Sequence, residues 1–208
     1  MEAFAAAVAE HLLPHLPALA PWADAQALAA EQGRFCAALA RANERLNLTG
    51  IVDPQGMAVR HVLDALLALP VLGVHGPIVD LGSGCGVPGI PLALALPERP
   101  VVLLESRQRK AEALAGLVDE LGLGPRVQAL RARGEEWLAE HRAGDLVSRA
   151  VGTVEAQLQL LRPVRDRFER LVMLKGPAGR EELERARRLL SGYGPASDVH
   201  VHEVKAAS

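Results

Sequence analysis

The segment from Ile78 to Pro91 most constrains the fold, because it reads as a short apolar strand, a glycine-dense turn and the start of a helix. Its sequence is IVDLGSGCGVPGIP, with glycine at positions 82, 84 and 86. Glycine lacks a Cβ, so this backbone can turn with positive φ and come close to a ligand lying across the strand end. The helix N-terminus carries free N–H groups that suit a carboxylate or a phosphate. The segment therefore predicts a small-molecule cofactor site.

Two acidic residues help to choose the cofactor. Gly84, Gly86 and Gly89 satisfy the dinucleotide pattern G-x-G-x-x-G. However, Asp80 stands at the strand end, where a carboxylate would repel a pyrophosphate and attract the amine of a methionine moiety. Glu105 ends the next predicted strand, at the position where an acid accepts hydrogen bonds from both ribose hydroxyls. Asp80 favours S-adenosyl-L-methionine (SAM) over NAD, and the two acids together favour a cofactor site over a glycine turn that binds nothing.

The chain changes its pattern once, near residues 70 to 77, where residues that break helices gather. Residues 1–70 show apolar residues at helical spacing, and residues 71–208 are expected to form a SAM-binding domain. Strands are expected near residues 78–81, 101–105, 127–131, 146–149, 171–175 and 199–204, with helices near 89–96, 109–121, 135–141, 154–161 and 180–191. This alternation predicts a doubly wound, mostly parallel, Rossmann-like α/β sheet with an N-terminal helical extension.

A series of short motifs, in order along the chain, resembles the small-subunit rRNA guanine-N7 methyltransferases, the glucose-inhibited division protein B (RsmG) family. The motifs are Asn47–Thr49, Arg60–Asp64, Asp80–Pro91, Leu104–Ser106 with Arg109–Lys110, Arg133–Glu136, Ser148–Ala150 and Leu174–Gly176. The resemblance implies a class I SAM-dependent methyltransferase that acts on N7 of a guanosine in 16S rRNA, as free RNA or in the 30S subunit. It also implies SAM contacts at Gly82, Val87, Gly134, Glu135 and Arg149.

The chain departs from the family pattern at several positions. Ala42 precedes Asn43 where the family usually has Trp, and Asp64 is followed by Ala65 in place of Ser. The usual ending of the last strand is missing after Val204. The position of His61 in a family motif favours a role in the site, and Arg149 at the end of a buried strand needs a partner there. His61 and Arg149 are therefore the candidate catalytic residues.

Charge gives a limited view of the partner. The net charge is −2, and the best RNA-binding candidates are Arg107, Arg109 and Lys110 beside the second strand end, together with Lys175 after the fifth strand. Lys175 has the alternative role of capping the sheet. Aromatic residues make up 3% of the chain, too few for an extended stacking platform for single-stranded RNA. Recognition is expected to rest on contacts with phosphates and RNA shape.

Other features point to a cytoplasmic protein without a membrane segment or a metal. No apolar run reaches the length of a membrane span, and the N-terminus lacks the features of a signal peptide. Cys36 and Cys85 lack metal-ligand spacing and are expected to be free thiols.

Three classes of function stay open at this point. The first is methylation of 16S rRNA. The second is SAM-dependent methylation of a small molecule or a protein, because the cofactor motifs say nothing about the acceptor. The third is a dinucleotide-binding oxidoreductase or a non-catalytic nucleotide-binding module.

Overall fold

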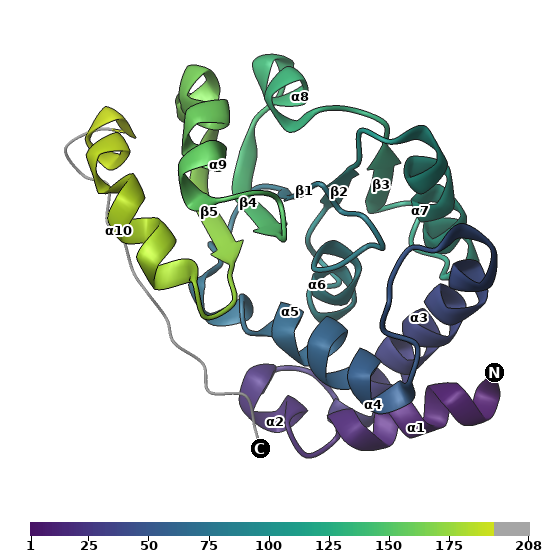
Figure 1. Ribbon diagram of the computed structural model, residues 1–208. Coiled ribbons are helices and arrows are strands. Elements are labelled where there is room, and N and C mark those ends of the chain that lie inside the picture. Colours follow the sequence, from purple (N-terminus) through teal and green to yellow (C-terminus); the bar gives the residue numbers. More distant parts are fainter. Residues whose placement is uncertain (194–208) are drawn as a thin grey trace.

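A five-stranded parallel sheet forms the centre of the molecule in the computed structural model, which describes residues 1–193. The strands are β1 (Ile78–Leu81), β2 (Val101–Leu104), β3 (Val127–Leu130), β4 (Ala143–Arg149) and β5 (Phe168–Leu174). They lie in the order β3-β2-β1-β4-β5, and every pair is parallel. This confirms the predicted α/β fold (Figure 1). The strand expected near residues 199–204 lies outside the described residues.

Helices cover both faces of the sheet because the strands alternate their buried side chains between two apolar clusters. The connecting helices are α6 (Gly89–Ala95), α7 (Gln108–Glu120), α8 (Gly134–Glu140), α9 (Val154–Leu161) and α10 (Gly179–Leu190), with short 3₁₀ turns at Arg162–Arg167 (η3) and Ser191–Tyr193 (η4). Ile78 and Leu103 pack in the cluster that includes α6 and α7. Val79 and Leu104 pack in the cluster that includes α8 and α9. The sheet is therefore doubly wound, as predicted.

The N-terminal segment is helical and packs on the α6 and α7 side of the sheet (Figure 1). Its elements are α1 (Glu2–Leu12), α2 (Leu16–Leu19), α3 (Ala25–Leu46), α4 (Pro54–Met57), the π-helix η1 (Ala58–Leu63), α5 (Asp64–Leu66) and the 3₁₀ turn η2 (Leu69–Val71). Asp24 caps α3, since its side chain accepts a hydrogen bond from the Ala27 N–H at 2.8 Å. Phe35 and Leu39 of α3 share one apolar cluster with Ile90 of α6. The two parts on either side of residue 70 thus have a common core.

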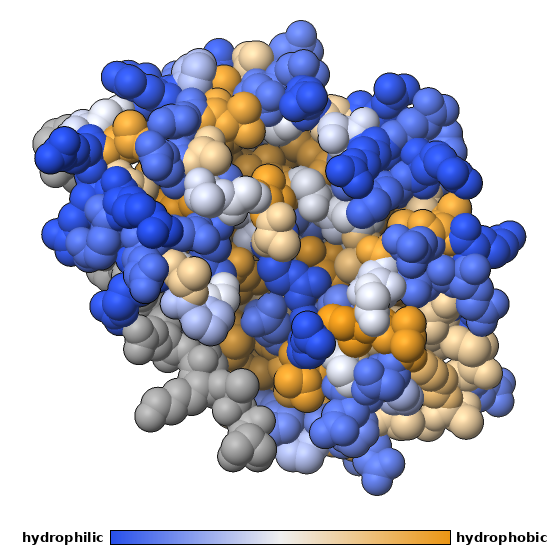
Figure 2. All heavy atoms as spheres, viewed as in Figure 1, coloured by the Kyte–Doolittle hydropathy of each residue, from blue (hydrophilic) through white to orange (hydrophobic). Residues whose placement is uncertain are grey.

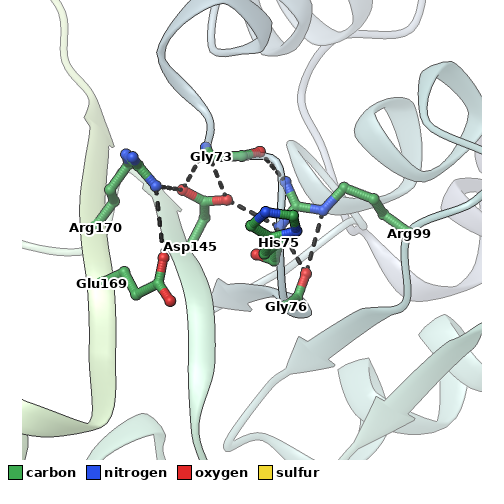
Figure 3. A network of polar contacts seen from close by, with 7 residues as sticks. All are labelled: Gly73, His75, Gly76, Arg99, Asp145, Glu169 and Arg170. Carbon is green, nitrogen blue, oxygen red and sulfur yellow. Dashed lines mark hydrogen bonds and ion pairs between the residues drawn. The ribbon is translucent and has the colours of Figure 1, made fainter.

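A network of polar contacts ties the connection before β1 to the sheet (Figure 3). Asp145 of β4 is fully buried and accepts hydrogen bonds from the Gly73 N–H at 3.0 and 3.1 Å and from Arg99 Nη2 at 2.9 Å. Arg170 Nη1 lies 4.0 Å from the same carboxylate. Arg99 also donates to the carbonyl oxygens of Gly73, His75 and Gly76, which fixes the path of this connection.

Candidate functional site

The loop after β1 turns sharply at three glycines and comes close to the loop after β4. Gly82, Gly84 and Gly86 have φ of +68°, +57° and +91°, in the left-handed region that favours glycine. A Cβ on Gly82 would lie 2.8 Å from Cγ2 of Val151, so no larger residue fits beside the β4 loop without a shift. At Gly84 the nearest atom to such a Cβ is a carbonyl oxygen at 3.7 Å. The backbone at Gly84 is therefore accessible to a ligand.

Asp80 lies in β1 directly below this loop and is fully buried. Its Oδ2 accepts a hydrogen bond from the Gly89 N–H at 2.9 Å, and its carbonyl oxygen accepts one from the Ser83 hydroxyl at 3.0 Å. Its Oδ1 has no partner among the described residues. Burial raises the pKa of Asp80 from 3.8 to about 7. A buried carboxylate with one unpaired oxygen favours a cationic group of a ligand beside it.

Glu105 follows β2 and has its carboxylate fixed by the backbone of two loops. It is 6% exposed, and its Oε2 accepts a hydrogen bond from the Gly84 N–H at 3.2 Å. Its Oε1 accepts one from the Arg107 N–H at 2.8 Å. Each carboxylate oxygen keeps lone pairs for further donors. This arrangement suits a pair of neighbouring hydroxyls, which is what a ribose presents.

The loop after β3 also meets the end of β1. Gly134 begins α8, and a Cβ there would lie 2.5 Å from Cδ2 of Leu81, the last residue of β1. Glu135 follows in the first turn of α8 and is half-buried. Val87 differs from the other predicted SAM contacts because its side chain is packed in the apolar core at 4% exposure. Only the backbone of Val87 is therefore available to a ligand.

Arg149 ends β4 and connects this edge of the sheet to the N-terminal segment. Its guanidinium donates to the carbonyl oxygen of Arg60, to Asp64 Oδ2 at 3.3 Å and to His61 Nδ1 at 3.1 Å. Burial, and then the charge of Arg149, lower the pKa of His61 to about 4, so His61 is neutral at physiological pH. The same guanidinium is close enough to oppose the rise in the pKa of Asp80. The two candidate catalytic residues are thus in direct contact.

The RNA-binding candidates fall into two groups. Arg107 and Arg109 are exposed and Lys110 is half-buried, around the start of α7. Arg109 also lines a groove of about 330 Å³ between α3 and α7. Lys175, in contrast, forms an ion pair with Glu182 at 2.9 Å and donates to the carbonyl oxygen of Gly152. The contacts of Lys175 match the capping role considered for it.

Three residues at the site were not among the predicted site residues. Gly89 donates to Asp80, and a Cβ on Gly89 would lie 2.7 Å from Oδ2 of that residue. The Thr49 hydroxyl forms a hydrogen bond with His61 Nε2 at 2.9 Å. Asn43 forms two hydrogen bonds with the backbone of Thr49. Thr49 lies in a family motif and Gly89 in the glycine-rich segment, and these were the available signals.

Other potential reactive groups give no alternative centre. Cys36 and Cys85 are free and buried, as expected, and burial raises the pKa of both thiols, to about 12 for Cys36. Within residues 1–193, no group of three or more His, Cys, Asp or Glu side chains is arranged to hold a metal ion. None of the helices described is long and apolar enough to cross a membrane.

The ends of four neighbouring strands converge on one crevice on the face shown in Figure 2, where hydrophobic residues are visible between hydrophilic rims. The sheet order, the glycine loop after β1 and the acid after β2 fit a class I SAM-dependent methyltransferase. A similar fold is found in the methyltransferase domain of METTL16, with a TM-score of 0.51 and 12% identity, over 78% of this chain and 70% of that chain. The cofactor of this class is SAM.

The particular family follows from the sequence comparisons. The family model described as rRNA small subunit methyltransferase G matches residues 29–207, and the chain belongs to this family. Ribosomal RNA small subunit methyltransferase G of Solibacter usitatus is 36% identical over 86% of this chain and 83% of its own length. The protein of the same name from Mycobacterium avium is 38% identical over 81% of this chain and 69% of its own length. The predicted family is thereby confirmed, and with it the methyltransferase class over the dinucleotide-binding alternative.

Proposed function

We propose that this chain transfers the methyl group of SAM to N7 of a guanosine in 16S ribosomal RNA. Membership of the rRNA small subunit methyltransferase G family supports the choice of acceptor. The observation that carries the donor site is the pair of buried carboxylates at neighbouring strand ends. Asp80 has an unpaired oxygen and Glu105 has both oxygens oriented by backbone N–H groups.

The residues of the crevice match the polar groups of SAM. Asp80 would accept from the cationic amine, and Glu105 would accept from the two ribose hydroxyls. Arg149 would pair with the carboxylate, with the backbone of Gly84 and the start of α8 at Gly134 lining the space between. SAM, when bound, supplies a methyl group activated by a sulfonium. The protein binds and orients it, and keeps water from part of the crevice.

This chemistry needs alignment and no general base. Guanine N7 carries a lone pair and no hydrogen, so there is no proton to remove before the methyl group is attacked. His61 is neutral and both of its ring nitrogens are engaged, by Arg149 and by Thr49. His61 is therefore unsuited to be a base. Rate acceleration is expected to come from positioning and from a preorganised crevice.

On the RNA side, the exposed guanidinium groups of Arg107 and Arg109, with Lys110, are the proposed phosphate contacts. They lie around the start of α7, which follows Glu105. The proposed partner is 16S rRNA, as free RNA or in the 30S subunit, and the proposed compartment is the cytoplasm. Lys175 is a weaker candidate because its ammonium is held by Glu182.

The acceptor is tested by incubating the protein with labelled SAM and, separately, 30S subunits, bare 16S rRNA and a total metabolite extract. We expect label in the RNA of one or both of the first two reactions and none in the third. A Glu105→Gln variant is the matched negative control, because its size is unchanged and its charge is lost. Label in a metabolite or in ribosomal protein would support the alternative of a small-molecule or protein methyltransferase.

A further inference from the structure

The guanidinium of Arg149 is oriented by the N-terminal segment. Its three acceptors are the Arg60 carbonyl, the Asp64 carboxylate and His61 Nδ1, all from η1 and the first residue of α5. A π-helix such as η1 is rare and is frequently found at functional sites. His61 of this π-helix and Arg149 are 88 positions apart in the sequence. The cofactor crevice is thus completed by a segment outside the parallel sheet.

The hydrogen bonds of His61 fix its tautomer. Arg149 has only donors, so His61 Nδ1 at 3.1 Å must be the acceptor. The proton of the neutral ring is therefore on Nε2, which donates to the Thr49 hydroxyl at 2.9 Å. The Arg60 carbonyl oxygen also lies within hydrogen-bonding distance of Nδ1, at 3.3 Å, but it could accept a hydrogen bond only from the other tautomer. His61 is 3% exposed, and protein groups replace water at both nitrogens.

Thr49 is itself fixed to the end of α3. Its N–H donates to Asn43 Oδ1 at 2.8 Å, and its carbonyl oxygen accepts from Asn43 Nδ2 at 2.9 Å. The Ile51 N–H donates to the Thr49 hydroxyl at 3.1 Å, which leaves this oxygen as a well-oriented acceptor for His61. An unbroken series of hydrogen bonds therefore runs from α3 to the carboxyl end of β4.

We propose that His61 is a positioning residue, which acts through Arg149 and sets the direction of its guanidinium for the carboxylate of SAM. This rests on the proposed function, in which Arg149 contacts SAM. The acceptor at Nδ1 sets the guanidinium, and the donor at Nε2 sets the plane of the ring. Loss of the contact between Nδ1 and Arg149 weakens cofactor binding, whereas loss of the contact between Nε2 and Thr49 mainly lowers the stability of the N-terminal segment.

Two substitutions separate these contacts. His61→Asn keeps an acceptor oxygen near the position of Nδ1 and loses the link to Thr49, whereas His61→Gln can reach Thr49 and loses the acceptor for Arg149. We expect His61→Gln to raise the Kd for SAM by about tenfold, the usual effect of losing one charge-assisted hydrogen bond. His61→Asn should raise it by about threefold or less. Calorimetry gives the Kd, and thermal unfolding of the same samples gives the stability.

The outcomes distinguish this inference from the proposed function. If Arg149→Ala binds SAM as tightly as the parent protein, the proposed contact of Arg149 with SAM is wrong. If Arg149→Ala weakens binding but His61→Gln and His61→Asn do so equally, in proportion to their loss of stability, His61 has only a structural role. Nitrogen-15 NMR of the imidazole in the unsubstituted protein needs no variant to fold. It should show a protonated Nε2 and an unprotonated Nδ1, and a proton on Nδ1 would overturn the inference.

Discussion

Two buried carboxylates on neighbouring strands, Asp80 of β1 and Asp145 of β4, differ in how their charge is compensated. Asp145 is level with Ile78, where β1 begins, and two arginines and a backbone N–H surround it (Figure 3). Asp80 lies one residue before β1 ends, and one of its oxygens has no partner within residues 1–193. The first carboxylate stabilises the fold and the second is suited to a ligand. At this sheet, the partners of a buried acid indicate its role better than its burial does.

Removing the carboxylate of Asp145 should have the largest effect on stability. Asp145→Ala leaves Arg99, whose side chain is 11% exposed, without its ion pair. Breaking a buried pair in this way costs about 3 to 5 kcal/mol of the free energy of unfolding. Urea or thermal unfolding measures this loss, and the Kd for SAM of the folded protein should be unchanged. Glu169→Ala is the control, because Glu169 lies 3.7 Å from Arg170 but is 64% exposed, and should cost less than about 1 kcal/mol.

Removing the carboxylate of Glu105 should have the opposite result, a large loss of affinity for SAM with little loss of stability. Glu105→Ala loses the proposed acceptor of two charge-assisted hydrogen bonds and should weaken SAM binding by about 2 to 3 kcal/mol. Its stability should change much less than that of Asp145→Ala. Calorimetry with SAM measures the affinity, and Glu112→Ala on the exposed face of α7 is the matched control. Unchanged affinity in Glu105→Ala would remove this residue from the cofactor site.

The pH dependence of SAM binding tests the unpaired oxygen of Asp80. Because burial raises the pKa of Asp80 to about 7, the carboxyl group of the free protein is protonated below that pH. The contribution of this group to the free energy of unfolding therefore falls as the pH rises from about 4 to about 7. The amine of SAM would favour the ionised form. Affinity should therefore rise about tenfold from pH 6 to pH 8, with release of a proton on binding. Calorimetry in buffers of different ionisation enthalpy measures that proton.

The matched control for this effect is Asp80→Asn, which should bind SAM weakly and with no pH dependence between pH 6 and 8. A parent protein whose affinity is also flat over this range would show that Asp80 does not pair with the amine. Asp80 would then resemble Asp145 as a structural carboxylate.

The smallest expected effect is on the rate of methyl transfer. The pKa of His61 is about 4 and no proton has to leave guanine N7, so the single-turnover rate with saturating SAM and RNA should be flat from about pH 6.5 to 8.5. Rapid quenching with labelled SAM measures this rate. A log-linear rise with a slope near one, abolished by His61→Ala without loss of binding, would make His61 a general base and contradict the proposed mechanism.

The sequence predicted the parts of the molecule that depend on local pattern. The strands β1, β2 and β3 begin and end within one residue of the predicted bounds, because apolar runs separated by turn residues specify a parallel sheet. The strands β4 and β5 were predicted at the right places, but each begins three residues earlier than expected. The glycine loop was predicted because positive φ requires glycine at its turns. The distant contacts were not predicted. Asp145 lies just before the strand predicted at residues 146–149, and no local pattern shows its partners. The hydrogen bond between His61 and Arg149 joins two motifs that no local pattern connects.

The most direct measurement for the proposed function is the methylation state of N7 at single guanosines of 16S rRNA, with and without this protein. Cleavage chemistry specific for N7-methylguanosine, read by primer extension, reports each position. In RNA from cells that lack the protein, we expect one guanosine to lose its N7 methyl group, and incubation of the 30S subunits or RNA with purified protein and SAM should restore it. Glu105→Ala should fail to restore it at limiting SAM. An identical N7 methylation pattern in RNA from both kinds of cell would contradict the proposed reaction.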